Sequence, residues 1–81
     1  MLFMTAILID REAIKARIRE LGFTYAGVAR RAEISVYTLN KIVSPAYGIP
    51  HAYTRKRLAR ALEISEDVLF PPVDAGEEEA S

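Results

Sequence analysis

The stretch YAGVARRAEISVYTLNKIVS, residues 25–44, carries the pattern that decides the fold. Small and apolar residues recur there at the three- and four-residue spacing of a helix face; they are Val28, Ala29, Ala32, Ile34, Leu39 and Ile42. Ser35 stands where a hydroxyl side chain would cap a second helix. The pattern predicts two short helices joined by a tight turn, over residues 25–32 and 36–43.

The turn between these helices needs a backbone conformation with positive φ, which glycine adopts without strain. The residue at this position is Glu33, and a side chain in that conformation costs about 1 kcal/mol. Where the two helices cross, the side chain has to be small, and Ala29 meets that need. We therefore expect Glu33 to be the strained point of the segment.

Three further helices are predicted around this pair, over residues 11–21, over residues 55–62 and, as a short final helix, over residues 66–69. Apolar residues at helical spacing and a capping residue at each start support them. The expected N-terminal caps are Asp10, Thr24, Ser35, Thr54 and Ser65. Gly22 is expected to end the first helix, and Pro71 and Pro72 to stop the last.

A chain of 81 residues suggests one domain, and the predicted fold is an all-α, compact four- to five-helix domain over residues 10–72. Residues 1–9 are almost wholly apolar, and their structure stays open between a floppy start, a short strand and a turn packed on the core. They are too short to span a bilayer and lack the features of a signal peptide. Residues 73–81 have the composition of a disordered acidic tail.

The residue inventory argues against catalysis and against metal or cofactor sites. The chain has no cysteine, which excludes disulfides and thiolate ligands and fits a cytoplasmic protein. His51 is the single histidine, in a predicted loop without an obvious acid partner. No nucleophile or phosphate-cradle motif is present. We expect no enzyme, no metal, no cofactor and no membrane partner.

A formal net charge of zero conceals a segregation of charge along the chain. Four acids and no base lie in residues 74–81, whereas residues 24–61 hold seven bases and one acid, a net charge of +6. Such clustering is an electrostatic footprint for a polyanion. A merely solvated basic face is the alternative.

The helix over residues 36–43 would present the side opposite Leu39 and Ile42. The residues predicted there to face DNA bases are Ser35, Val36, Tyr37, Asn40 and Lys41. Asparagine can bond adenine, lysine can reach guanine, and valine can touch a thymine methyl. The residues predicted to contact phosphates or the DNA backbone are Thr24, Tyr25, Thr38, Arg55, Lys56 and Arg57.

Residues 10–71 resemble the lambda-repressor-like (Cro/C1-type) helix-turn-helix DNA-binding domains, and within them the Ner-type regulators of phages and prophages. The likeness rests on the helix order, on TLNKIV in residues 38–43, on the proline-containing loop that follows, and on the ending KRLARALEISEDVLFPP. The resemblance implies a transcriptional regulator, in the Ner case a repressor. It would bind double-stranded operator DNA as two protomers, with the helix over residues 36–43 in the major groove.

Two positions depart from the family pattern. Tyr25 replaces the glutamine that often opens the first helix of the motif, and Glu33 replaces the turn glycine. The rival interpretation is a helical protein–protein adaptor or an antitoxin that uses the same fold, because fold alone does not determine function. Salt dependence separates the two, since DNA binding weakens steeply as salt rises.

Overall fold

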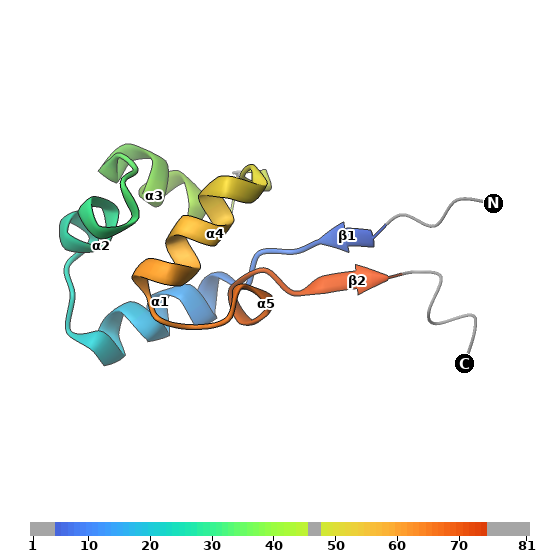
Figure 1. The fold of residues 1–81 in the computed structure, drawn as a ribbon, viewed down its shortest axis with the longest axis horizontal. Helices are drawn as coiled ribbons and strands as arrows, with labels where there is room; N and C mark the ends of the chain where they lie inside the picture. The colour runs from blue at the N-terminus through green and yellow to red at the C-terminus, as the bar shows by residue number, and fades with distance from the viewer. Residues whose placement is uncertain (1–4, 46–47, 75–81) are drawn as a thin grey trace.

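Within residues 5–45 and 48–74, which the computed structural model describes, the chain forms a helical body with two short strands (Figure 1). The helices are α1 (Arg11–Leu21), α2 (Tyr25–Ala32), α3 (Val36–Ile42), α4 (Ala52–Ala61) and α5 (Glu66–Leu69). The strands are β1 (Thr5–Ile7) and β2 (Pro72–Asp74). The predicted small body of five helices is therefore confirmed.

Helices α1, α2 and α4 end in the same backbone motif. A residue just beyond each helix is left-handed, with φ of 73° at Gly22, 61° at Glu33 and 56° at Glu63. Its amide donates to the carbonyl three residues earlier, and the next amide donates to the carbonyl five residues earlier. These two bonds form a Schellman motif, which satisfies carbonyls left unpaired at a helix end. The positive φ predicted at Glu33 is thus confirmed.

The same motif prepares the start of the next helix. After the left-handed residue comes a half-buried apolar residue, which is Phe23, Ile34 or Ile64, and then a hydroxyl residue. The sequence Glu-Ile-Ser serves this purpose twice, at residues 33–35 and 63–65, a repeat that we did not anticipate. These connections are only three or four residues long, so successive helices stay close enough to share one core.

Side-chain caps confirm four of the predicted helix starts. Backbone amides donate to Asp10 Oδ1 at 3.0 Å, to Thr24 Oγ1 at 3.0 Å and to Ser35 Oγ at 2.9 Å. Ser65 Oγ accepts a longer bond, of 3.3 Å, from the amide of Asp67. Each of these side chains satisfies an amide that the helix itself leaves unpaired.

The prediction that Thr54 caps the fourth helix is wrong. Helix α4 begins at Ala52 with His51 as its N-cap, and Thr54 lies in the first turn with only 8% of its surface exposed. Thr54 is buried by the packing of α4 in the fold, and a capping pattern in the local sequence cannot reveal such burial. Helix α3 ends at Ile42, one residue before the predicted end, which is within the usual scatter of helix ends.

The core lies where the apolar faces of the helices meet. Its largest fully buried side chains are Phe70, Ile14, Leu39, Ile42, Leu58, Leu62, Leu69 and Val28. Ala29 and Ala32 are only 2% and 1% exposed, at the place where α2 packs against α3 and α4. Small side chains at such a contact allow the helix axes to approach closely. The inward position predicted for Ala29 is confirmed.

The two strands pair antiparallel and extend from the helical body (Figure 1). Ile7 pairs with Pro72 and Thr5 with Asp74. Of the alternatives left open for residues 1–9, a short strand is therefore present at residues 5–7. Residues 73 and 74, which were predicted to belong to a disordered acidic tail, form part of β2 instead. Residues 1–4 and 75–81, which include the rest of that predicted tail, lie outside the described part of the chain.

Backbone hydrogen bonds join the ribbon to the helices. The amide of Leu8 donates to the carbonyl of Pro71 at 3.0 Å, and the amide of Asp10 donates to that of Leu69 at 2.8 Å. These long-range bonds bring the end of α5 against the start of α1. They extend the hydrogen bonding between the two chain segments from the strands to the helices. Among the residues described, no helix combines the length and the apolar character needed to cross a membrane.

Candidate nucleic-acid interface

Helix α3 is held by buried side chains that decide what it presents outward. Leu39 and Ile42 have no exposed surface. The turn fastens the start of α3 to α2, because the amide of Ile34 donates to the carbonyl of Ala29 at 2.9 Å. One side of a helix with 3.6 residues per turn is thereby anchored, and the other must face solvent.

The outward side of α3 consists of the residues that were predicted to face DNA bases. We call it the α3 face: Ser35, Val36, Tyr37, Asn40 and Lys41. All five residues are exposed, and Tyr37 stands out with 70% of its surface accessible. The outward orientation predicted for Val36, Tyr37, Asn40 and Lys41 is confirmed. An exposed aromatic beside an exposed valine is typical of a contact surface.

Two contacts within the α3 face limit what its side chains can do. The ammonium of Lys41 lies 5.2 Å from the centroid of the Tyr37 ring, a cation–π arrangement that keeps the two side chains together. The Asn40 amide donates to the carbonyl of Val36 at 3.1 Å. Asn40 would exchange that bond if both ends of its amide bound an adenine edge.

The hydroxyl of Ser35 is largely occupied by capping. It accepts the Thr38 amide at 2.9 Å and donates to Thr38 Oγ1 at 2.9 Å. Ser35 was predicted to face bases, and the structure places its side chain in the helix cap instead. Thr38 is half-buried at the margin of the α3 face, where its own hydroxyl hydrogen can still be donated to a phosphate.

Two further predicted backbone contacts, Thr24 and Tyr25, lie at the start of α2. Thr24 is exposed while its hydroxyl caps the helix by accepting the Gly27 amide at 3.0 Å. Tyr25 is half-buried and packs against the core. The position is therefore an anchored helix start with one exposed residue, and Tyr25 contributes packing in addition to any surface contact.

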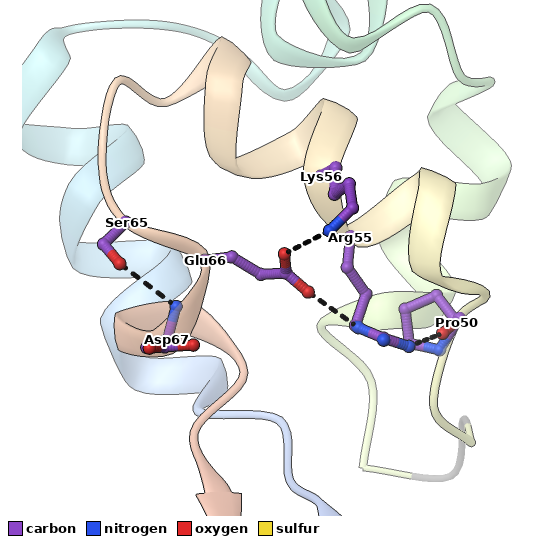
Figure 2. A network of polar contacts seen from close by, with 6 residues as sticks. All are labelled: Pro50, Arg55, Lys56, Ser65, Glu66 and Asp67. Carbon is purple, nitrogen blue, oxygen red and sulfur yellow. Dashed lines mark hydrogen bonds and ion pairs between the residues drawn. The ribbon is translucent and has the colours of Figure 1, made fainter.

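Arg55, predicted to contact a phosphate, is partly buried and engaged in contacts within the protein. Its side chain is only 17% exposed. Its Nε donates to Glu66 Oε2 at 3.0 Å and its Nη1 donates to the carbonyl of Pro50 at 2.7 Å (Figure 2). The guanidinium thus joins α4 to α5 and to the loop before α4. Because Arg55 and Glu66 are eleven residues apart, only the tertiary structure reveals this pairing.

The hydrogen bond from Arg55 lowers the pKa of Glu66 below its ordinary value. Partial burial acts in the opposite direction, and the nearby ammonium of Lys56 adds to the lowering. Lys56 Nζ lies 3.4 Å from Glu66 Oε1 (Figure 2). The ionised form of Glu66 is therefore favoured, and it is this form that bonds to Arg55 and Lys56 at the junction between α4 and α5.

The other two predicted phosphate contacts on α4 are more exposed. The Lys56 side chain is 65% exposed despite its ion pair. Arg57 lies with its guanidinium 5.5 Å from the Tyr53 ring centroid and donates a long bond of 3.5 Å to the carbonyl of Glu33. Both side chains remain accessible to an anion, so two of the three basic residues predicted here keep that capacity.

Tyr53 is an exposed aromatic that the sequence prediction missed. It is 61% exposed, it stacks on His51 with ring centroids 5.9 Å apart, and the Arg57 guanidinium lies near its ring. An aromatic in the first turn of a basic helix was the available signal. It was overlooked because the segment was assigned to a loop.

Arginines also close the far end of α4. Arg17 donates to the carbonyls of Leu62 and Glu63 at 2.8 and 3.1 Å. Arg31 donates to the carbonyl of Ala61 at 3.4 Å and forms an ion pair with Glu63 at 3.3 Å. Cations at a helix C-terminus neutralise unpaired carbonyls and the helix dipole. Arg31, although it belongs to the basic segment, therefore stabilises the C-terminal end of α4.

Near these residues lies a feature that the sequence prediction also missed, which we call the arginine hollow. It measures about 310 Å³ and is lined by Arg31, Ala32, Glu33, Arg57 and Arg60. The spacing of Arg57 and Arg60 on one side of α4 was its only sequence signal. In the described residues, no group of three or more His, Cys, Asp or Glu side chains could hold a metal ion.

A comparison of the chain with protein-family models, with curated proteins and with solved structures finds no match.

Proposed function

We propose that the protein is a cytoplasmic, sequence-specific DNA-binding regulator in which α2, the turn and α3 act as a helix-turn-helix. The α3 face enters the major groove, where Asn40, Lys41 and Tyr37 contact bases. Thr24, Lys56 and Arg57 contact phosphates on either side. In the repressor role that the Ner resemblance implies, this binding occludes a promoter.

The observation that carries the proposal is the α3 face itself. Leu39 and Ile42 are fully buried and anchor the helix, and its opposite side exposes Tyr37, Asn40 and Lys41. The same helix lies in a segment with a net charge of +6 over residues 24–61. A preorganised helix face with hydrogen-bonding groups, set in positive surroundings, matches the needs of groove recognition.

The test is fluorescence anisotropy on native upstream DNA, comparing wild type with Asn40→Ala and Lys41→Ala. A good base contact is worth about 1–3 kcal/mol, so each variant should bind roughly 5- to 150-fold more weakly. Lys41→Ala should also flatten the dependence of affinity on salt, because it removes one displaced counterion.

Arg19→Ala is the matched control, since it removes one positive charge from α1, away from α3 (Figure 1). It should bind nearly as wild type does, and circular dichroism should show all three variants folded. If Asn40→Ala and Lys41→Ala bind like the control, α3 is not the recognition helix. An affinity that hardly changes with salt would contradict DNA binding and favour the adaptor or antitoxin alternative.

A single short helix gives limited specificity, so we propose that two protomers bind one two-fold symmetric operator. Their α3 helices would then enter successive major grooves, roughly 34 Å apart. Footprinting should reveal two protected half-sites with that spacing. Protection of one half-site at saturating protein would contradict the two-protomer arrangement.

A further inference from the structure

The arginine hollow concentrates positive charge between the end of α2 and the second half of α4. Arg57 and Arg60 stand three residues apart on α4, so their side chains leave the same side of that helix. Because α2 packs against α4, Arg31 joins them from the other wall. Glu33 is the one acid in the lining, against three guanidinium groups.

The charged side chains that line the hollow differ in how many contacts they make within the protein. Arg31 is positioned by Glu63 and Ala61 and by the Phe23 ring, 4.6 Å from its guanidinium carbon. The Arg60 side chain, in contrast, forms no hydrogen bond or ion pair with any residue that the structure describes, and it is exposed. Glu33 likewise forms no ion pair within that part of the chain, so none of the three arginines is held by its carboxylate, which lines the hollow as an opposing charge.

We infer that the arginine hollow binds a phosphate group. Guanidinium groups present planar forks of N–H donors that match the oxygens of phosphate, and three of them converge here. A volume of about 310 Å³ is at the small end of ligand sites, which suits one phosphate with part of the group that carries it. Arg31 supplies a fixed donor, and Arg57 and Arg60 close on the anion.

The phosphate can come from two sources. The hollow includes Glu33 in the turn that leads into α3, so a DNA backbone phosphate would reach it beside a bound groove. A free phosphorylated compound would use the same donors. The inference does not depend on the proposed function, because the site is defined by its donors and not by the source.

The experiment titrates the protein with inorganic phosphate and with AMP, using chloride at matched ionic strength as the reference, while amide chemical shifts are followed by NMR. Amides of residues 31–33 and 57–60 should shift saturably with phosphate and not with chloride. Arg60→Gln should weaken binding about tenfold or more, the loss expected for a charge-assisted hydrogen bond. Glu33→Gln should tighten it, because an opposing charge is removed.

Arg30→Gln is the matched control, since it removes the same charge from an exposed neighbour on α2 that does not line the hollow. It should change phosphate affinity by less than about twofold, because a solvent-exposed charge is screened. Equal losses in Arg30→Gln and Arg60→Gln, or no saturable shift with either probe, would overturn the inference.

A last arm distinguishes the two sources with a native upstream duplex. If Arg60→Gln weakens duplex binding and lowers its salt slope by about one, the DNA backbone supplies the phosphate. If Arg60→Gln leaves duplex binding unchanged but weakens the binding of phosphate and AMP, a free phosphorylated compound is the ligand. Duplex binding that survives Arg60→Gln leaves the proposed function standing, since that depends on Asn40 and Lys41.

Discussion

Glu33→Gly should make the protein more stable, although it deletes a charged side chain and adds no contact. Glu33 is left-handed, with φ 61°, and a side chain there costs about 1–2 kcal/mol. Glycine relieves that strain, but it has more conformational freedom in the unfolded chain. Losing this freedom on folding costs roughly 0.5–1 kcal/mol of stability. The net gain is therefore about 0–1.5 kcal/mol, and a gain of about 1 kcal/mol would raise Tm by roughly 4–8 °C in a domain of this size.

The other two left-handed residues, Gly22 and Glu63, allow the same strain energy to be measured at independent positions. Glu63→Gly relieves the same strain but also breaks the 3.3 Å ion pair with Arg31, between side chains that are 60% and 46% exposed. Such a pair is worth about 0.2–1 kcal/mol, so the gain should be smaller. Gly22→Ala should cost about 1 kcal/mol from backbone strain alone, because nothing lies within 4 Å of the added Cβ.

The assay is thermal and urea unfolding followed by circular dichroism at neutral pH. Glu33→Ala is the control, because it removes the carboxylate and keeps a side chain at positive φ. Glu33→Gly is expected to be the most stable variant, followed by Glu63→Gly. Gly22→Ala is expected to be less stable than wild type. If Glu33→Gly is no more stable than Glu33→Ala, strain at this position is not what limits stability and the reasoning fails.

Three further predictions follow from the packing and the caps. Leu58→Ala should cost about 2–5 kcal/mol in urea unfolding, because Leu58 is fully buried; a loss below about 1 kcal/mol would show a loosely packed site. Thr24→Ala should cost about 1 kcal/mol through loss of the α2 cap, and Thr24→Ser, which keeps the hydroxyl, should retain most of the stability. Because the folded pKa of Glu66 lies below its ordinary value of 4.5, its stabilising contribution is complete above that pH and is lost as pH falls through the folded pKa. The difference in urea midpoint between wild type and Glu66→Gln should therefore shrink on acidification below about 4.5, and a constant difference would exclude the charge as its source.

The local structure of this chain could be predicted where it depends on neighbours in sequence. The caps at Asp10, Thr24, Ser35 and Ser65 each join a side chain to an amide two or three residues later. The left-handed turn at Glu33 depends on bonds that span at most five residues. The bounds of α1, α2 and α5 and the outward side of α3 followed from these signals and from the apolar spacing.

The fate of the arginines could not be predicted in the same way. Arg55 looked like an exposed phosphate contact, yet it is bound to Glu66 and Pro50. Arg31 meets Glu63, thirty-two residues away, and only the packing of α2 on α4 brings it beside Arg60. A sequence shows that charges are present, but the partner of each depends on where folded helices put it.

The strand pairing and the start of α4 belong to the same category. Residues 72–74 pair with residues 5–7 although the helices lie between them in the sequence. Thr54 is buried by contacts that its neighbours in sequence do not reveal. The sequence by itself determined the helices, the side-chain caps of four of them and the exposed α3 face, because these depend on bonds within a few residues. Tertiary structure alone decided which cations are committed to holding the fold and which line the arginine hollow, because those contacts join residues that only packing brings together.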